Sequence, residues 1–183
     1  MRIWILLGLL ALTAAVYTTQ QFVAPRYGAA VENRFLERLK DISPSKPLTA
    51  ANLREWAQDN ANVKAVRGYV MPVIIPLDVL FLLAFGSFLG FASCALAGRI
   101  EGLSIMPMWV WWVFPGLYIV ADACEGVAIA SLLSWPETIT RHSFAALSAL
   151  TFAKIATVWF AIIQFLGLAA LALGFYLFSF AKA

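Results

Sequence analysis

The stretch from 109 to 135 constrains the fold more than any other part of the chain, because it is long, apolar and carries two acids. It reads WVWWVFPGLYIVADACEGVAIASLLSW, with tryptophan at both ends and Asp122 and Glu125 inside. As an α-helix it would be about 40 Å long, at a rise of about 1.5 Å per residue, which matches a bilayer with its interfaces. The stretch therefore predicts a transmembrane helix with two carboxyl groups at membrane depth.

The composition is that of an integral membrane protein. Of the 183 residues, 62% are hydrophobic and 13% are charged, and the mean hydropathy is +0.83. A soluble domain is nearer about 45–50% apolar and about 25% charged. The net charge of +3 does not indicate nucleic acid, because no basic stripe with interleaved aromatic residues lies on a soluble face. We expect the lipid bilayer as a partner, and no nucleic acid.

Other apolar stretches are also long enough to cross a bilayer. Together they predict an all-α fold: a polytopic membrane protein with a four-transmembrane-helix bundle in a single membrane domain over 1–183. Met1 and Arg2 before an apolar run would also fit a signal peptide, but the run continues to Val23, which favours a retained helix. The predicted spans are 3–23, 70–97, 109–135 and 144–180.

Most of the charge lies between the first two spans, and residues 24–69 predict a short helical excursion outside the membrane. Residues 32–41 have the spacing of an amphipathic helix, and SPSKP at 43–47 ends it. Thr49 can cap a second helix that runs to about Asn60. The excursion is too small for a core of its own, so we expect two short helices lying on the bundle. Such a cap either covers a site or merely connects two spans.

An even number of spans puts both termini on one side of the membrane. The lysines and arginines of the excursion favour a cytoplasmic excursion, whereas Arg2 before the first span favours a cytoplasmic N-terminus. Because the first span usually dominates, we expect a multi-pass protein of the cell (inner) membrane with cytoplasmic N- and C-termini.

The ionisable residues within the predicted spans fall at one depth. Counted from the excursion side, they lie roughly 12–18 Å into the membrane at about 1.5 Å per residue. An isolated charge at that depth costs about 2.5–3.5 kcal/mol on insertion scales, so such groups normally face one another or water. We expect them to converge, with two tyrosines near them, in one candidate ligand-binding cluster: Asp78, Asp122, Glu125, Lys154, Tyr118 and Tyr17.

Lys154 is the only basic residue in this layer, against three acids. We expect it to stay charged by pairing with Glu125 in the first place and Asp122 in the second. One interpretation is a polar clasp that fixes the register of the helices and does nothing else. The other is a cavity open toward the excursion side, and the excess of acids favours it.

Gly86 and Gly90 form a GxxxG motif in the second span, extended by Cys94 and Gly98. Small residues every four positions let a neighbouring helix approach closely, and we expect that neighbour to belong to the same chain. Cys94 and Cys124 would lie about 20 Å apart on antiparallel helices, which is too far for a disulfide.

The sequence offers no motif for a cofactor or a metal ion. It has one histidine, His142, and neither a CxxC nor an HExxH motif, so we expect no cofactor and no metal site. Asp122 and Glu125 could act as a general acid and base on a lipid-like substrate, but no nucleophile motif or phosphate loop accompanies them. The balance is against an enzyme.

Successive spans carry a proline or a threonine with an ionisable residue: Pro76 with Asp78, Pro115 with Asp122 and Glu125, and Thr151 with Lys154. In this arrangement the chain, over about residues 50–180, resembles a loose group of small four-helix bacterial membrane proteins of unknown function. The Asn that often follows the Glu in that group is Gly126 here. The resemblance brings no activity with it.

Two functions fit these features. The first is a binding or transport protein whose acids and Lys154 hold a small polar, cationic or lipid-like ligand, or relay protons. The second is an accessory or assembly subunit that docks other membrane protein subunits and uses the cluster as a structural clasp. Replacing Asp122 by Asn separates them, because a binding protein stays assembled and loses activity, whereas a clasp loses stability.

Overall fold

The computed structural model describes residues 3–27, 31 and 49–180 of the chain. Over these residues the protein is helical and has no strand, and four of its helices are long and apolar enough to cross a membrane. The elements are α1 (Ile3–Tyr27), α3 (Ala50–Gln58), η1 (Asn60–Asn62), α4 (Val63–Gly68), η2 (Tyr69–Asp78), α5 (Val79–Ala97), α6 (Met108–Ser134), η3 (Pro136–Thr138) and α7 (Arg141–Phe180).

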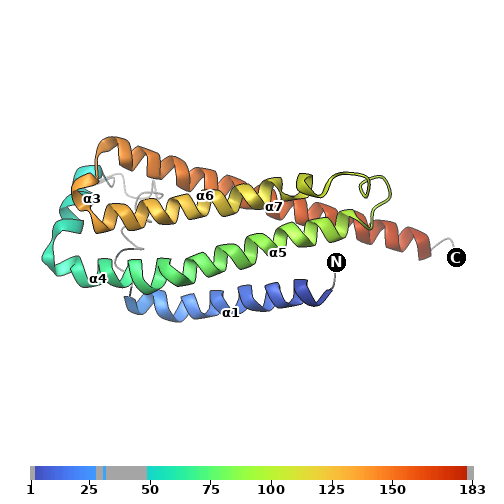
Figure 1. Ribbon diagram of the computed structural model, residues 1–183, viewed down its shortest axis with the longest axis horizontal. Helices are drawn as coiled ribbons and strands as arrows, with labels where there is room; N and C mark the ends of the chain where they lie inside the picture. The colour runs from blue at the N-terminus through green and yellow to red at the C-terminus, as the bar shows by residue number, and fades with distance from the viewer. Residues whose placement is uncertain (1–2, 28–30, 32–48, 181–183) are drawn as a thin grey trace.

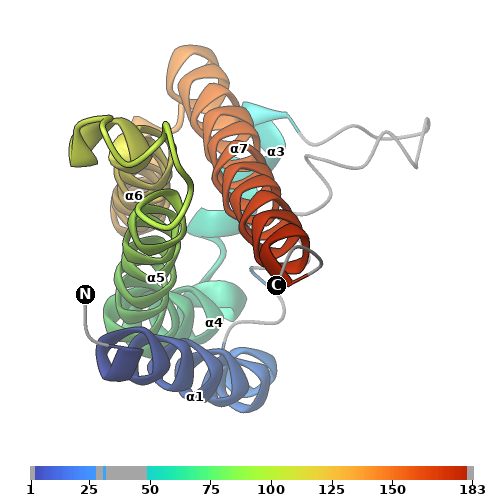
Figure 2. The same ribbon diagram turned by 90° about the vertical axis from the view of Figure 1, so that its right-hand side faces the viewer.

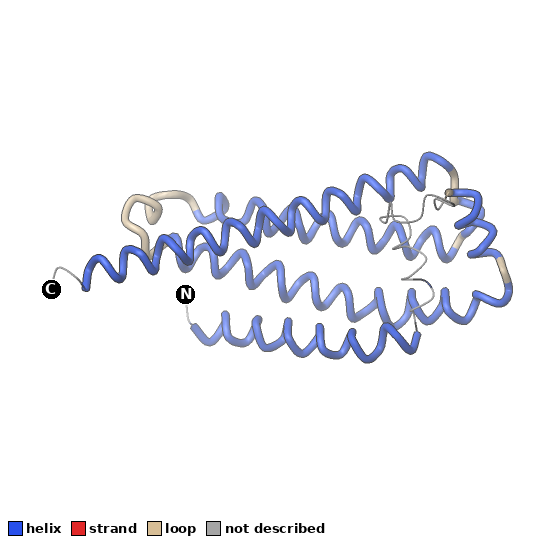
Figure 3. The backbone as a smooth tube through the Cα atoms, turned by 180° about the vertical axis from the view of Figure 1, so that it is seen from behind, coloured by secondary structure: helices blue, strands red, loops and turns tan. Residues whose placement is uncertain are grey.

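The long helices form a bundle along one axis (Figure 1). α5, α6 and α7 pack against one another, and α1 lies against α5 and η2 on the outside of this group (Figure 2). α1 begins and α7 ends at the same end of the bundle, while α3, α4 and η3 lie at the opposite end (Figures 1 and 3). The predicted bounds of the first, third and fourth spans agree with α1, α6 and α7 to within a few residues.

One face of α7 packs on the bundle, and the rest is apolar and exposed. Its exposed side chains include Phe152 at 68%, Trp159 at 59% and Ile163 at 59% of their full accessibility. A helix that is apolar all round is typical of a membrane span, because lipid takes the place of a protein core around it. The inward face repeats every three or four residues, as in left-handed helix packing, and consists of Leu147, Thr151, Lys154, Val158, Ala161, Phe165 and Leu168.

The second span is not a continuous α-helix from residue 70, so that prediction is wrong in its first part. The regular helix α5 begins at Val79, and the preceding segment η2 contains Met71 and Ile75 in extended conformations, with φ/ψ of −139°/115° and −117°/117°. Each of these two residues directly precedes a proline, whose ring disfavours the α conformation of its neighbour. The break places Asp78 at the start of α5 instead of inside a helix.

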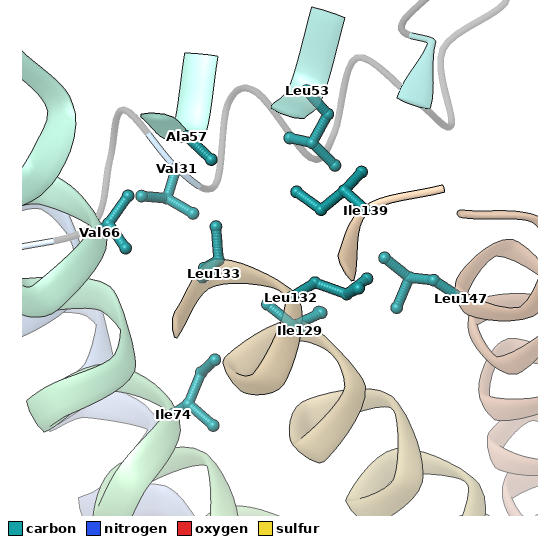
Figure 4. Close-up of a cluster of buried hydrophobic side chains, with 10 residues drawn as sticks. All are labelled: Val31, Leu53, Ala57, Val66, Ile74, Ile129, Leu132, Leu133, Ile139 and Leu147. Carbon is teal, nitrogen blue, oxygen red and sulfur yellow. The ribbon is translucent and has the colours of Figure 1, made fainter. Parts of the chain in front are cut away.

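The excursion is tied to the bundle by an apolar cluster (Figure 4). Thr49 caps α3 as predicted, since its hydroxyl accepts a hydrogen bond from the backbone N–H of Asn52 at 3.2 Å. Leu53 is fully buried in this cluster, which also contains Ile139, between η3 and α7, and Leu147 of α7. α3 therefore lies on the bundle, as we expected. The predicted helix over 32–41 and its break at 43–47 lie outside the described residues.

α5 and α6 approach closely where α5 carries glycine. A Cβ atom at Gly86 would lie 2.4 Å from Cγ1 of Ile119, and one at Gly90 would lie 2.8 Å from the ring of Trp112. Both neighbours belong to α6. This close approach brings the first half of α5 and η2 toward the acids of α6.

Candidate functional site

Lys154 bridges the two acids of α6. Its Nζ lies 2.8 Å from Oδ1 of Asp122 and 2.8 Å from Oε2 of Glu125. Asp122 and Glu125 are three residues apart, so they point to the same side of α6, and they are only 2% and 5% exposed. The predicted ion pair with Glu125 is confirmed, and Asp122 is an equally close partner.

Thr151 extends the bridge on the side of α7. It is 4% exposed and lies one turn before Lys154, on the same face of the helix. Its hydroxyl donates a hydrogen bond to Oε1 of Glu125 and also lies 3.1 Å from the carbonyl oxygen of Leu147. Glu125 is therefore contacted on both carboxylate oxygens, by Lys154 on one and by Thr151 on the other.

Asp122 is the most enclosed of the acids. Tyr118, one helical turn earlier on α6, lies within electrostatic reach of its carboxylate. Its Oδ1 is buried and has no hydrogen bond of good geometry, so Lys154 balances the charge of this atom without a well-aligned donor. Tyr118 itself is 3% exposed. Asp122 is consequently a fixed part of the protein interior.

Asp78 is the third acid, and it is held much more loosely. It is half-buried at the end of η2, within the electrostatic reach of Asp122, Lys154 and Glu125. Within the described residues, its one hydrogen bond comes from Nε2 of Gln20 in α1, at 3.5 Å, the outer limit for such a bond. Its place at the start of α5 favours a negative charge, because the first turn of a helix carries unpaired N–H groups.

The charges of this cluster do not balance. With all groups ionised, the three acids and Lys154 sum to −2, from three negative charges and one positive charge. Burial of excess charge is expensive at low dielectric, so a further proton or cation is required to offset it. The cluster is not fully covered by the rest of the chain, since the side chain of Lys154 is 32% exposed and Asp78 is half-buried.

Tyr17, which we expected in the cluster, lies outside it. It is 53% exposed, and its ring packs against Phe81, with the ring centroids 6.2 Å apart. The face of α1 that meets α5 carries Thr13, Val16 and Gln20. A residue next to Val16 is turned about 100° away from that face, which explains the position of Tyr17.

Gln20 is the residue that sequence reasoning missed. It has the same phase along the helix as Thr13, which is seven residues earlier. A search for polar residues at that spacing would have found it. Thr13 itself uses its hydroxyl to donate to the carbonyl oxygen of Leu9 at 2.8 Å, so it has no proton left for the cluster.

The cluster is an arrangement of acids around one lysine. Within the described residues, no group of three or more His, Cys, Asp or Glu side chains could hold a metal ion. Cys94 and Cys124 are both free thiols. What the arrangement can do is hold a charged or hydrogen-bonding group against Asp78, beside a fixed ion-paired triad of Lys154, Asp122 and Glu125.

Comparison of the chain with protein-family models, with curated proteins and with solved structures gave no match. The resemblance to small four-helix bacterial membrane proteins therefore stays a prediction, and the function has to be argued from the site itself.

Proposed function

We propose that the protein crosses the inner membrane with its four apolar helices, both termini in the cytoplasm, and binds a small cation at Asp78. The occupant that we propose is an ammonium group. The observation that carries this proposal is the third acid, which lies within reach of a triad that Lys154 already holds together. A structural ion pair needs one acid and one base, and no third carboxylate.

The difference in burial and in contacts between Asp78 and the triad supports binding at Asp78 and not at the triad. Asp122 and Glu125 are almost fully buried and occupied by Lys154, so a ligand would have to break buried contacts to reach them. Asp78 is half-buried and has only the long contact from Gln20. An ammonium group between Asp78 and Gln20 would gain a charge-assisted hydrogen bond and lower the net charge of the cluster.

The alternative is an accessory or assembly subunit in which the cluster is a clasp. Two observations favour it. Lys154 is bound by both acids of α6, which is the geometry of a complete structural bridge. In the most apolar stretches of α1 and α7 only 11% of the residues are buried by the rest of the chain, so long apolar faces remain for lipid or for another membrane subunit.

Thermal unfolding in detergent with methylammonium chloride tests the proposal against this alternative. We expect methylammonium to raise the melting temperature of the wild type relative to equal concentrations of sodium chloride, because a ligand stabilises the folded state that binds it. Asp78→Asn should abolish that rise. Glu137→Gln removes the same charge from an exposed position in η3 and should keep it.

A wild type that gains no stability from methylammonium, or an Asp78→Asn variant that gains as much as the wild type, would refute an ammonium site at Asp78. A clasp predicts the first of these results.

A further inference from the structure

A second polar site lies at the excursion end of the bundle, away from the buried cluster. A groove of about 1110 Å³ runs between α3 and the segment that leads from η3 into α7. Its floor is apolar and its rim is polar: Ile139 is 3% exposed and Trp56 is partly buried, while the rim side chains are exposed. The described rim includes Arg54, Glu55 and Arg141.

The two arginines come from different elements and line the same groove. Arg54 lies on α3, and Arg141 is the first residue of α7. Within the described residues neither guanidinium makes an ion pair or a side-chain hydrogen bond. Two unpaired guanidinium groups on one groove are suited to a phosphate, which arginine binds through paired, charge-assisted hydrogen bonds. The positive end of the long helix α7 adds to this preference.

The lining of the groove also includes two acidic side chains, Asp59 and Glu55, and they restrict the chemical class of ligand that the groove can bind. Asp59 already has a partner within the protein, since its Oδ1 accepts a hydrogen bond from the backbone N–H of Ala61 at 2.9 Å. Glu55, which lies beside Arg54 in the sequence, has no such contact within the described residues. A purely anionic head group would be repelled by Glu55. A head group with a phosphate and an amine would satisfy both charges.

The level of the groove fits a membrane head group. α3 and η3 lie at the end of the bundle, beyond the end of α6 (Figure 1). Arg141 is thirteen residues before Lys154 in α7, which is about 20 Å along the helix axis at 1.5 Å per residue. That is about the distance from the middle of a bilayer to its head groups. The apolar floor at Ile139 and Trp56 suits the carbon skeleton next to the phosphate.

We propose that this groove binds a zwitterionic phosphate–amine head group, with the phosphate on Arg54 and Arg141 and the amine on Glu55. The chemistry is that of phosphoethanolamine, whether it belongs to a membrane lipid or to a soluble molecule. This site stands independently of the proposed cation site at Asp78.

Native mass spectrometry of the full chain in detergent tests this inference, with dioleoyl phosphatidylethanolamine, dioleoyl phosphatidylglycerol and soluble phosphoethanolamine as probes. We expect phosphatidylethanolamine to bind more tightly than phosphatidylglycerol. Each of the changes Arg54→Gln and Arg141→Gln should weaken it about tenfold, because each removes a charge-assisted contact. The matched changes Arg67→Gln and Arg99→Gln, at exposed positions outside the groove, should leave binding unchanged.

The change Glu55→Gln tests whether Glu55 binds the amine of the head group. It should remove the preference for phosphatidylethanolamine and leave the arginine dependence intact. If soluble phosphoethanolamine binds as tightly as the lipid, with the same arginine dependence, the head group alone is recognised and the inference holds. Tighter binding of phosphatidylglycerol in the wild type, or equal binding by the groove variants and the control variants, overturns it.

Discussion

At the scale of single residues, Lys154 determines whether the buried cluster is stable, because it is ion-paired with two carboxylates at once. Removing one member of a buried ion pair leaves its partner without compensation. Lys154→Met should therefore lower the free energy of unfolding by about 3–5 kcal/mol, measured by denaturation in mixed micelles. The cost will be smaller to the extent that the stranded acids take up protons.

Partial rescue distinguishes a lost ion pair from a packing defect. Changing Glu125 to Gln in the Lys154→Met chain removes one stranded charge, and the double variant should be more stable than the lysine variant alone. The same should hold for Asp122→Asn. If neither second change restores stability, then Lys154 is not paired in this layer.

The residue scale also shows why the sequence predicted some of the site and not the rest. Asp122 and Glu125 share a face because they are three residues apart, and Lys154 is the only base at their depth. Both relations follow from the positions of these residues in the sequence. Gln20 is selected by the rotation of α1 about its axis, and that rotation is set by its packing on α5. The only local sign of it is the seven-residue spacing between Thr13 and Gln20, and the choice of Tyr17 did not use that spacing.

At the scale of elements, Gln164 of α7 supplies the hydrogen bond that Pro115 cannot donate within α6. Pro115 has no N–H to donate to the carbonyl oxygen of Trp111, one turn earlier, so the helix leaves that oxygen unpaired. Nε2 of Gln164 in α7 donates to this oxygen at 2.8 Å. In a membrane an unpaired carbonyl is expensive, since no water replaces the missing donor. The proline thus creates an acceptor that fixes the register of α7 on α6.

Gln164→Leu should accordingly lower the free energy of unfolding by about 1 kcal/mol, measured by denaturation in mixed micelles. In a Pro115→Ala background residue 115 regains its N–H, so the same glutamine change should have much less effect. An equal loss in both backgrounds would mean that Gln164 stabilises the protein by some means other than this carbonyl.

The close approach of α5 and α6 gives a second prediction for elements. The methyl group of Gly90→Ala would meet three ring atoms of Trp112, each at 2.8 Å, and that ring is held edge-on by Phe91 at a centroid distance of 5.0 Å. We expect the variant to lose about 1–3 kcal/mol of unfolding free energy, because the ring has to move.

Gly167→Ala provides the matched control, because nothing lies within 4 Å of a Cβ atom at that position of α7. It should keep or gain stability, by up to about 1 kcal/mol, since alanine is the better helix former. Both variants can be compared by thermal unfolding in detergent. A loss at position 167 as large as that at position 90 would show that the substitution itself, and not the contact with Trp112, is responsible.

At the scale of the whole molecule, the number of long helices followed from the length and hydropathy of the apolar stretches. Their lateral order did not, because helices that are apolar all round give no sign of which face meets which neighbour. The position of α1 outside the group of α5, α6 and α7 is an example. The break in the second span at Met71 and Ile75 was open to prediction, since both residues precede a proline.

The molecule as a whole separates a fixed polar triad from a loosely held acid, and the proposed binding at Asp78 rests on this separation. Asp122, Glu125 and Lys154 join α6 to α7. Asp78 joins η2 to α1 through the 3.5 Å contact from Gln20. Because Asp122 belongs to the ion-paired triad, Asp122→Asn should lower thermal stability under either function, and it does not separate them as we expected from the sequence. Asp78→Asn should leave thermal stability nearly unchanged.

Equilibrium dialysis of radiolabelled methylammonium against the protein in nanodiscs tests the proposed cation site most directly. The account predicts saturable binding to the wild type at one site per chain, retained by Glu137→Gln and lost in Asp78→Asn. Binding to the wild type that does not exceed that of empty nanodiscs, or saturable binding that survives Asp78→Asn, would contradict it.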